Sequence, residues 1–399
     1  MPDAIRKIEN ADVSGKRVLV RADLNVPMAD GKVSDATRIE QVLPLIRDLC
    51  GRGAKVVVMS HFGRPKGKRV AEMSLEPVAD AMREMLAPIP VSFAPECIGA
   101  EARAAVDALE AGGVCVLENL RFHAGEEAND NDFAAALAEL GDIYVNDAFS
   151  SSHRAHASIE AIAHILPAYA GPAMAAELEA LTMALENPRR PVAALIGGAK
   201  VSTKIDLLSN LVSKADVLII GGGMANTFLH AQGRGVGKSL HEPDESETVA
   251  QITEDAAKSG CRIVLPEDAV VAPELREGVA SEVRNVRDIP DNAMILDIGP
   301  DTVAEIRARL GACHTVLWNG PLGAFEVAPF GEGTFSIARE VARLTRESGL
   351  VSVGGGGDTV AALNAAGVKD DFTYVSTAGG AFLEWLEGRE LPGVAALVQ

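Results

Sequence analysis

The sequence predicts an α/β fold of two doubly wound, parallel-sheet domains of the Rossmann-like type. Strand-like and helix-like segments alternate through both halves of the chain, which is typical of parallel strands joined by right-handed helical crossovers. The 399 residues exceed what one hydrophobic core usually supports. Hydrophobic residues make up 48% of the chain and aromatic residues 4%, which favours the aliphatic interior of buried parallel strands. We expect a hinge helix to join the domains and a cleft to lie between them.

In the first half, RVLVRADL at 17–24 predicts a buried strand. Apolar side chains at three- and four-residue steps then predict a helix over 37–49. AKVVVMS at 54–60 is the next predicted strand. A serine cap and a proline in the first turn predict a helix over 74–86. GVCVLEN and DIYVNDA continue the series of strands to Ala148.

The second half repeats this alternation. Helices are expected from Lys200 and over 246–259, and strands are expected at PVAALIGG, ADVLIIGGG, CRIVLP, TVLWNGP, LVSVGGGG and TYVST. Between the halves, GPAMAAELEALTMALENPRRP at 171–191 predicts a helix closed by an Asn-Pro-Arg-Arg-Pro stop. We therefore place a first domain at 1–170, a connecting hinge helix at 171–188 and a second domain at 189–388.

Composition excludes several classes of protein. A net charge of −19 argues against nucleic acid or an anionic membrane surface as a partner. No apolar run approaches 18 residues, so we expect no membrane span. The first residues lack the apolar core of a signal peptide, so the cytoplasm is the expected location. The cysteines are odd in number and lack metal-type spacing, and we expect buried free thiols at Cys50, Cys97, Cys115, Cys261 and Cys313.

Arginines and histidines follow several predicted strands in the first half, in RADLNVP, HFGRP, ENLRF and SHRAH. Ligands of open α/β sheets bind beyond the carboxyl ends of strands. Arginines gathered there would repel one another unless an anion joined them. Taken singly, HFGRP could be a turn, and Asp23 and Asn25 could cap one. Together the motifs predict a site for a small, highly charged oxyanion, built from Arg21, Arg38, Arg64, Arg121 and Arg154 with His61 and His153 beside some of them.

Glycine runs characterise the second half: GGAKVSTK at 197–204, GGG at 221–223, GGGGDT at 354–359 and STAGG at 376–380. Glycine loops that open helices cradle nucleotide phosphates. Lys200 and Lys204 are expected on one face of a first helical turn, where lysine is unfavourable unless an anion binds; the alternative is an exposed lysine pair. Asp358 is expected to face a Mg²⁺ ion that bridges the phosphates, although an N-cap would explain it too.

An arginine site for a small oxyanion and a glycine-loop site for nucleotide phosphates in one chain together predict a two-substrate phosphotransferase. GRGVGKS at 233–239 is a false P-loop match, because its spacing is one residue short and a helix precedes it; we expect a loop. A dinucleotide-dependent dehydrogenase is the leading alternative enzyme, but no G-x-G-x-x-G follows the first strand of either half. A hinged, non-catalytic binding protein is the other alternative, and it would need neither a magnesium carboxylate nor a second phosphate site.

The ordered motifs closely resemble the phosphoglycerate kinase family over nearly the whole chain. They are RADLNVP, HFGRP, ENLRF, NDAFSSSHRAHAS, GGAKVSTK, IIGGGMANTFL, WNGPLGAFE, GGGGDT, STAGGAFLEWLEG and ELPGV. The resemblance implies reversible, Mg²⁺-dependent transfer between 1,3-bisphosphoglycerate and ADP, giving 3-phosphoglycerate and ATP, as in glycolysis, gluconeogenesis and carbon fixation. It also implies a monomer, and a C-terminal stretch (389–399) that returns to the first domain.

Position by position, the resemblance implies three groups of residues. The phosphoglycerate would be bound by Asp23, Asn25, Arg38, His61, Phe62, Gly63, Arg64, Arg121 and Arg154, with Arg21 in the same basic patch. The nucleotide would be bound by Gly197, Gly198, Lys200, Lys204, Gly221, Gly222, Glu326, Gly355, Gly356, Gly357, Asp358 and Thr359, with Glu326 at the ribose and Asp358 near Mg²⁺. The transferring phosphoryl group would be surrounded by Arg38, Lys200, Gly357, Gly379 and Gly380. Ala22, Leu24 and Ala378 depart mildly from the family pattern.

Overall fold

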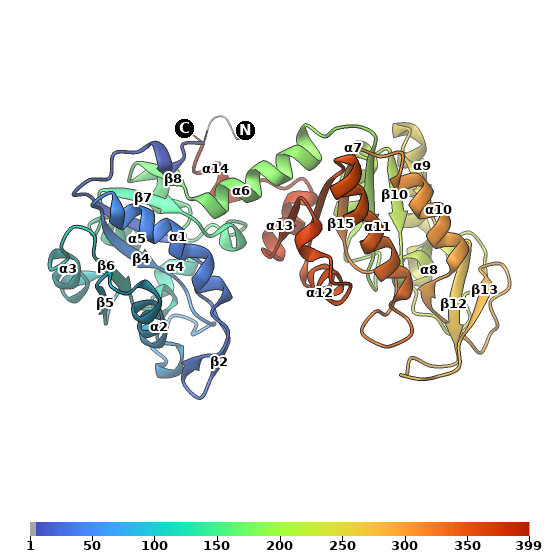
Figure 1. Ribbon diagram of the computed structural model, residues 1–399, viewed down its shortest axis with the longest axis horizontal. Coiled ribbons are helices and arrows are strands. Elements are labelled where there is room, and N and C mark those ends of the chain that lie inside the picture. The colour runs from blue at the N-terminus through green and yellow to red at the C-terminus, as the bar shows by residue number, and fades with distance from the viewer. Residues whose placement is uncertain (1–4, 399) are drawn as a thin grey trace. The chain divides into compact units, whose positions relative to one another are not determined.

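The computed structural model describes residues 5–398, which fall into two compact units (Figure 1). Unit 1 consists of Met1–Glu179 together with Glu390–Gln399, and unit 2 consists of Ala180–Arg389. Each unit contains a parallel sheet with flanking helices. The predicted α/β fold with two parallel-sheet domains is therefore confirmed.

Over the described residues, unit 1 has a sheet in the order β5-β6-β4-β1-β7-β8, with every pair parallel. The strands are β1 (Arg17–Arg21), β4 (Lys55–Met59), β5 (Val91–Ala94), β6 (Val114–Leu117), β7 (Ile143–Asn146) and β8 (Ala168–Ala170). The helices are α1 (Thr37–Gly51), α2 (Glu76–Leu86), α3 (Gly99–Asp107), α4 (Ala124–Glu127), α5 (Asn131–Ala138) and α14 (Pro392–Ala395). A small hairpin, β2 (Met28–Ala29) with β3 (Lys32–Val33), follows β1.

The core of unit 1 forms where α1 and α2 cover one face of this sheet. Ile39 and Ile46 of α1 are buried in one cluster with Val18 and Val20 of β1. The residues between them, such as Leu19, point to the opposite face, because side chains alternate along a strand. Both faces are thus buried, as the near-continuous apolar runs require.

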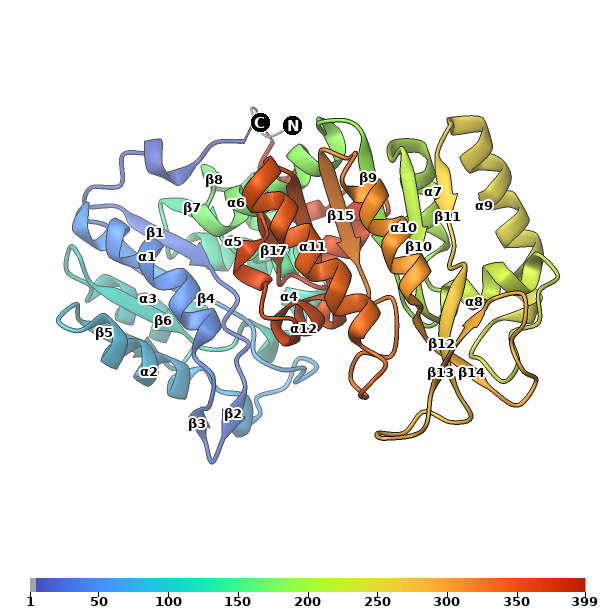
Figure 2. The same ribbon diagram turned by 45° about the vertical axis from the view of Figure 1, so that its right-hand side comes forward.

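Unit 2 has a second parallel sheet in the order β11-β10-β9-β15-β16-β17 (Figure 2). Its strands are β9 (Val192–Ile196), β10 (Val217–Ile220), β11 (Arg262–Val264), β15 (Thr315–Asn319), β16 (Val351–Gly355) and β17 (Tyr374–Ser376). Its helices are α7 (Ile205–Lys214), α8 (Gly222–Ala231), α9 (Ser246–Ser259), α10 (Pro300–Leu310), α11 (Glu332–Ser348), α12 (Gly357–Ala365) and α13 (Gly380–Leu386).

The sequence did not predict several strands. An antiparallel sheet in unit 2, β13-β12-β14, consists of β12 (Asp268–Ala272), β13 (Glu282–Asn285) and β14 (Met294–Ile298). In unit 1, β5 and β8 lie at the two edges of the sheet. These strands have only four and three residues, too few to show a clear hydrophobic period.

The expected helix from Lys200 is wrong, since α7 begins at Ile205. Residues 200–204 form a turn in which the Lys204 amide donates to Val201 O at 2.8 Å and Thr203 Oγ1 donates to Lys200 O at 3.0 Å. Val201 is fully buried and Lys200 is exposed. The burial of Val201 pulls this turn inward, so the two lysines do not share a helical face. The helix expected over 74–86 also starts later, at Glu76, although the Glu76 amide still donates to Ser74 Oγ at 3.2 Å.

A helix also forms over most of 171–187, as predicted. It comprises α6 (Pro172–Leu181) and a π-helical turn, Thr182–Glu186, and the division between the units falls within α6. At its start, Asp147 Oδ1 accepts from the amides of Ala173 at 2.8 Å and Met174 at 3.1 Å. The false P-loop is a loop, as expected, and all five cysteines are buried free thiols. Among the described residues, no helix is long and apolar enough to cross a membrane.

Candidate active site

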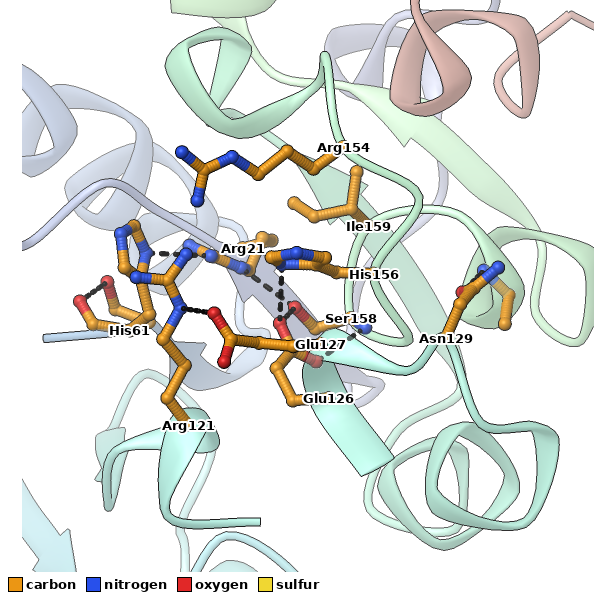
Figure 3. A network of polar contacts seen from close by, with 12 residues as sticks. Arg21, His61, Arg121, Glu126, Glu127, Asn129, Arg154, His156, Ser158 and Ile159 are labelled. Carbon is orange, nitrogen blue, oxygen red and sulfur yellow. Dashed lines mark hydrogen bonds and ion pairs between the residues drawn. The ribbon is translucent and has the colours of Figure 1, made fainter. Parts of the chain in front are cut away.

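In unit 1, arginine and histidine side chains gather near the carboxyl ends of β1, β4 and β6. We call Arg21, His61, Arg121, Arg154 and His156 the basic cluster; Figure 3 shows these side chains turned toward a common space. Arg21 ends β1, His61 follows β4 and Arg121 follows β6. Arg21 is 1% exposed and Arg121 is 4% exposed, so their charges lie inside the unit. The strand ends bring Arg21, His61 and Arg121 together, and the loop after β7 adds Arg154 and His156, of which His156 was not among the predicted residues.

All three guanidinium nitrogens of Arg21 have protein partners. Arg21 Nε donates to Ser158 Oγ at 3.0 Å, Nη1 donates to Ala22 O, and Nη2 lies 3.0 Å from His61 Nδ1. Arg121 has fewer partners: Nη1 donates to Gly63 O at 2.8 Å, while Nε is 3.3 Å from Glu127 Oε1 and forms no hydrogen bond. Arg121 therefore keeps donor capacity for a ligand.

A second basic group lies in the loop after β1 and at the start of α1. Arg38 Nη1 is 3.0 Å from both carboxylate oxygens of Asp23 and donates to Asn25 O at 3.0 Å. Ser150 Oγ donates to Asp23 Oδ2 at 2.6 Å. Asp23 thus holds Arg38 in place, and the remaining Arg38 nitrogens have no protein partner among the described residues.

The HFGRP loop connects this group to the basic cluster. The Gly63 amide donates to Asn25 Oδ1 at 3.0 Å, and the Phe62 amide donates to Asn119 Oδ1 at 3.1 Å. Gly63 has a φ of 59°, which favours glycine. Arg64 is exposed in the same loop and, within residues 5–398, forms no hydrogen bond or ion pair with the other predicted residues.

The charge of the basic cluster comes from its arginines. Burial, followed by the charges of Arg21 and Arg121, holds the pKa of His61 well below its usual range. Burial and the same arginines lower the pKa of His156 to about 4. Both imidazoles are thus neutral near pH 7. Arg21, Arg121 and Arg154 then carry the charge of the cluster, which suits an anion with several charges.

In unit 2, the glycine loops after β9, β10 and β15 pack backbone against backbone. A Cβ atom at Gly197 would lie 1.8 Å from Pro321 O, and one at Gly223 would lie 2.5 Å from Ala199 O. Gly222 has a φ of 65° and a Cβ there would lie 2.8 Å from Gly198 O. These glycines are therefore needed first for the close packing of the loops, which leaves their amides at the carboxyl edge of the sheet.

Lys204 lies inside this arrangement. Its Nζ donates to Gly197 O and to Asn319 Oδ1, both at 2.7 Å, and Asn319 Nδ2 donates to Gly355 O at 2.9 Å. Burial lowers the pKa of Lys204 to about 8, against an opposing effect of Asp358. Thr359 Oγ1 accepts from the Gly320 amide at 2.7 Å, which joins the start of α12 to the loop after β15.

A cavity of about 330 Å³ opens beside these loops, within unit 2. Its polar rim includes Gly198, Gly222, Glu326 and Asp358. Its apolar wall includes Leu240, Leu275, Met294, Leu296 and Leu322. A cavity of this size with one apolar side and one glycine-rich side suits a nucleoside with attached phosphates. The sequence predicted the polar rim but not the apolar wall, to which β14 contributes Met294 and Leu296.

Two helices begin with open space at their first residues. Gly356 has a φ of 98° and precedes α12; Gly379 has a φ of 52° and precedes α13. A Cβ atom at Gly357 or at Gly379 would meet no atom within 4 Å. Asp358 is exposed in the first turn of α12. A single carboxylate fits a Mg²⁺ ion that takes its other ligands from phosphates and water. Among the described residues, no three or more metal-ligating side chains cluster.

Sequence reasoning missed several supporting residues. Ser158 and Glu126 lie beneath the basic cluster, and Ser150 orients Asp23. Glu242, which follows the false P-loop at 233–239, accepts from the amide of Ser202 at 3.0 Å and from its Oγ at 2.5 Å. That contact fixes the turn that carries Lys200. Each of these partners is distant in sequence, and nothing in the local pattern indicates the pairing.

A basic cluster in one parallel-sheet unit and a glycine-rimmed cavity in the other are features of a two-substrate phosphotransferase. Comparison with known proteins narrows this class. The model of the family described as phosphoglycerate kinase matches residues 8–389. Phosphoglycerate kinases of Chelativorans sp. (strain BNC1) and Rhizobium meliloti (strain 1021) are each 61% identical, over 97% of this chain and 97% of theirs.

Solved structures agree with the sequence comparison. The structure of phosphoglycerate kinase from Coxiella burnetii is 43% identical with a TM-score of 0.92, and that from Pyrococcus horikoshii OT3 is 31% identical with a TM-score of 0.80. Each alignment covers 98% of both chains. The chain belongs to the phosphoglycerate kinase family and is a kinase.

A buried carboxyl group beside the cavity predicts a pH effect on stability. Burial raises the pKa of Asp297 to about 7 from 3.8, although the amides of Gly333 and Ile298 donate to it. Between these two pH values the folded chain holds more protons than the unfolded chain, so this group makes the free energy of unfolding fall as pH rises. The slope should approach about 1.4 kcal/mol per pH unit.

Urea unfolding of the wild type and of Asp297→Asn, followed by tryptophan fluorescence from pH 4 to 8, measures this effect. Both tryptophans, Trp318 and Trp385, belong to unit 2. The free energy of unfolding of the wild type, relative to that of Asp297→Asn, should fall toward pH 7. The free energy of unfolding of the exposed variant Asp301→Asn should instead follow the same pH dependence as that of the wild type. Parallel curves for wild type and Asp297→Asn would contradict the raised pKa.

Proposed function

We propose that the chain catalyses reversible phosphoryl transfer from 1,3-bisphosphoglycerate to ADP, giving 3-phosphoglycerate and ATP. The observation that carries this proposal is the pair of unlike anion sites: buried arginines in unit 1, and glycine helix starts beside an apolar cavity in unit 2. Membership of the phosphoglycerate kinase family supplies the identity of the substrates.

The phosphoglycerate is assigned to the first domain, 1–170 with 389–399. Its phosphate is bound by His61, Arg64, Arg121 and Arg154, since guanidinium groups form paired hydrogen bonds with oxyanions. Asp23 suits the hydroxyl group of the phosphoglycerate, and Asn25 accepts from the Gly63 amide of the HFGRP loop. Arg38, held by Asp23, reaches the carboxylate end with its uncommitted nitrogens. All three guanidinium nitrogens of Arg21 already have protein partners, so Arg21 supports the phosphate site by its charge and does not contact the ligand directly.

The nucleotide is assigned to the second domain, 189–388, with 171–188 as the connecting helix. The apolar wall of the cavity suits the adenine ring, and Glu326 on its rim suits the ribose. Phosphates fit the amides at the start of α12 and the Lys204 ammonium group. When bound, Mg²⁺ would be held by Asp358 together with nucleotide phosphates, where it would offset their charge.

No general base is needed in this reaction. In the ATP-consuming direction the nucleophile is the carboxylate of 3-phosphoglycerate, which is already ionised near neutral pH. The chain must therefore hold two polyanions in line and stabilise charge on the transferring group. Arg38, Lys200 and the amides of Gly357, Gly379 and Gly380 are proposed for that role. The cytoplasmic location remains a prediction from the sequence, and the monomeric state remains a prediction from the family resemblance.

Removing either proposed catalytic cation should abolish most activity. Arg38→Ala and Lys200→Ala should each lower the rate by a factor on the order of 10²–10³, as loss of a donor to developing charge does elsewhere. The assay follows hydroxylamine-trapped acyl phosphate formed from ATP, Mg²⁺ and 3-phosphoglycerate. Exposed matched controls, Arg103→Ala and Lys258→Ala, should stay within about twofold of wild type. Wild-type rates in both site variants would refute the assignment.

Gly357 tests whether the start of α12 contacts a ligand. Its φ is not in the left-handed region and a Cβ atom would meet nothing, so Gly357→Ala should fold with unchanged or slightly raised stability. The added methyl group would nevertheless occupy the space of the phosphoryl group, and the rate should fall by about tenfold or more, the equivalent of about 1.4 kcal/mol. Gly235→Ala, equally uncrowded, serves as the control. An active Gly357→Ala enzyme would place the phosphoryl group elsewhere.

Direct transfer between ligands on two units also requires the units to approach each other. We infer closure through the helix at 171–188, which would exclude water that could hydrolyse the acyl phosphate. Small-angle scattering of the free protein and of the protein with both substrates tests this. A smaller radius of gyration with both substrates is expected, and an unchanged radius counts against closure.

A further inference from the structure

Beneath the basic cluster, four side chains form one continuous line of hydrogen bonds (Figure 3). Ser158 Oγ is 2.6 Å from Glu126 Oε1, and Arg21 Nε is 3.0 Å from Ser158 Oγ. Arg21 Nη2 is then 3.0 Å from His61 Nδ1. Glu126 is fully buried, and it also accepts from the Ser158 amide at 2.9 Å. The line thus runs from a buried carboxylate to an imidazole at the proposed phosphoglycerate site.

The chemistry of the guanidinium group fixes the direction of both bonds that Arg21 makes in this line. A guanidinium group only donates, so Ser158 Oγ accepts from Arg21 Nε. The single hydroxyl proton of Ser158 is then free for Glu126 Oε1. At the other end, His61 Nδ1 must accept from Arg21 Nη2. A proton on Nδ1 would place two N–H groups face to face at 3.0 Å.

An accepting Nδ1 leaves one position for the imidazole proton. A neutral His61 then carries it on Nε2, because one ring nitrogen donates when the other accepts. Every charged or titratable neighbour that lowers the pKa of His61, namely Arg21, Arg121, His156 and Arg154, also disfavours a second proton. Within residues 5–398, His61 Nε2 forms no hydrogen bond, so its N–H is available to a ligand.

We propose that Glu126, Ser158 and Arg21 are positioning residues that hold His61 as the neutral Nε2–H tautomer, so that it donates to a phosphate oxygen of the phosphoglycerate. This inference rests on the proposed function for the identity of the ligand. The opposite tautomer would turn a lone pair toward an anionic oxygen and repel it. The relay therefore decides whether His61 favours or opposes binding.

Tyr144 provides a matched control next to the relay. It is fully buried, and its hydroxyl donates to the carbonyl oxygen of Ser158 at 2.8 Å. Tyr144→Phe thus removes a buried hydrogen bond to the same residue without touching the donors and acceptors of the relay. A merely structural role for this region predicts equal effects of Tyr144→Phe and Ser158→Ala.

The full-length protein labelled with ¹⁵N-histidine, with His61 assigned by His61→Gln, gives the direct test by two-bond ¹H–¹⁵N spectra. The wild type should show His61 Nε2 protonated and Nδ1 unprotonated from pH 6 to 8. Apart from His61→Gln for the assignment, this arm needs no variant of the relay and no ligand. A proton on Nδ1, or a charged His61 at pH 7, would overturn the proposal.

The variants then test the relay. Ser158→Ala and Glu126→Gln should give a mixed tautomer of His61, whereas Tyr144→Phe should keep the wild-type spectrum. Calorimetric titration with 3-phosphoglycerate should show affinity reduced about tenfold or more in the two relay variants, and within about twofold of wild type in Tyr144→Phe. Equal effects in all three variants would overturn the relay. A wild type that shows the predicted tautomer but binds no 3-phosphoglycerate would instead refute the proposed function.

Discussion

Positive charge buried at the carboxyl edge of a parallel sheet is the constraint on which unit 1 depends. Burying an uncompensated ion costs several kcal/mol even after relaxation. Arg21 and Arg121 are almost fully buried and lie near Arg154. Glu126 lies fully buried among them, and Glu127 is 3.3 Å from Arg121 Nε. These carboxylates offset part of the charge, and the remainder is available to an anionic ligand.

Unit 2 offers an anion mainly backbone amides of its glycine loops, whereas unit 1 offers arginine side chains. Three loops approach so closely that Gly197, Gly222 and Gly223 leave no space for a Cβ atom. Lys204 and Asn319 connect the loops by short hydrogen bonds. A protein of net charge −19 can thus present two local sites for anions, because the field inside each site is set by nearby groups.

Much of this architecture could be predicted from the sequence, because parallel strands bring their carboxyl ends to one edge. Arg21, His61 and Arg121 come together for that reason alone. The sequence failed where long-range packing decides the local conformation. The turn before Ile205 replaced an expected helical turn because Val201 is buried. In the antiparallel sheet around β12, the outer strand β13 is mostly exposed and so lacks a buried apolar pattern. Glu126 and Ser158 are 32 residues apart, so no local pattern pairs them.

The two units should bind different ligands at separate sites, 3-phosphoglycerate in unit 1 and the nucleotide in unit 2. Calorimetric titrations of the full chain with 3-phosphoglycerate and, separately, with ADP test it most directly when Arg121→Ala and Lys204→Met are compared. Arg121→Ala should weaken 3-phosphoglycerate binding about tenfold or more and leave ADP binding unchanged, and Lys204→Met should do the reverse. Loss of both ligands in either variant, or of neither ligand in both, would contradict the two-site account.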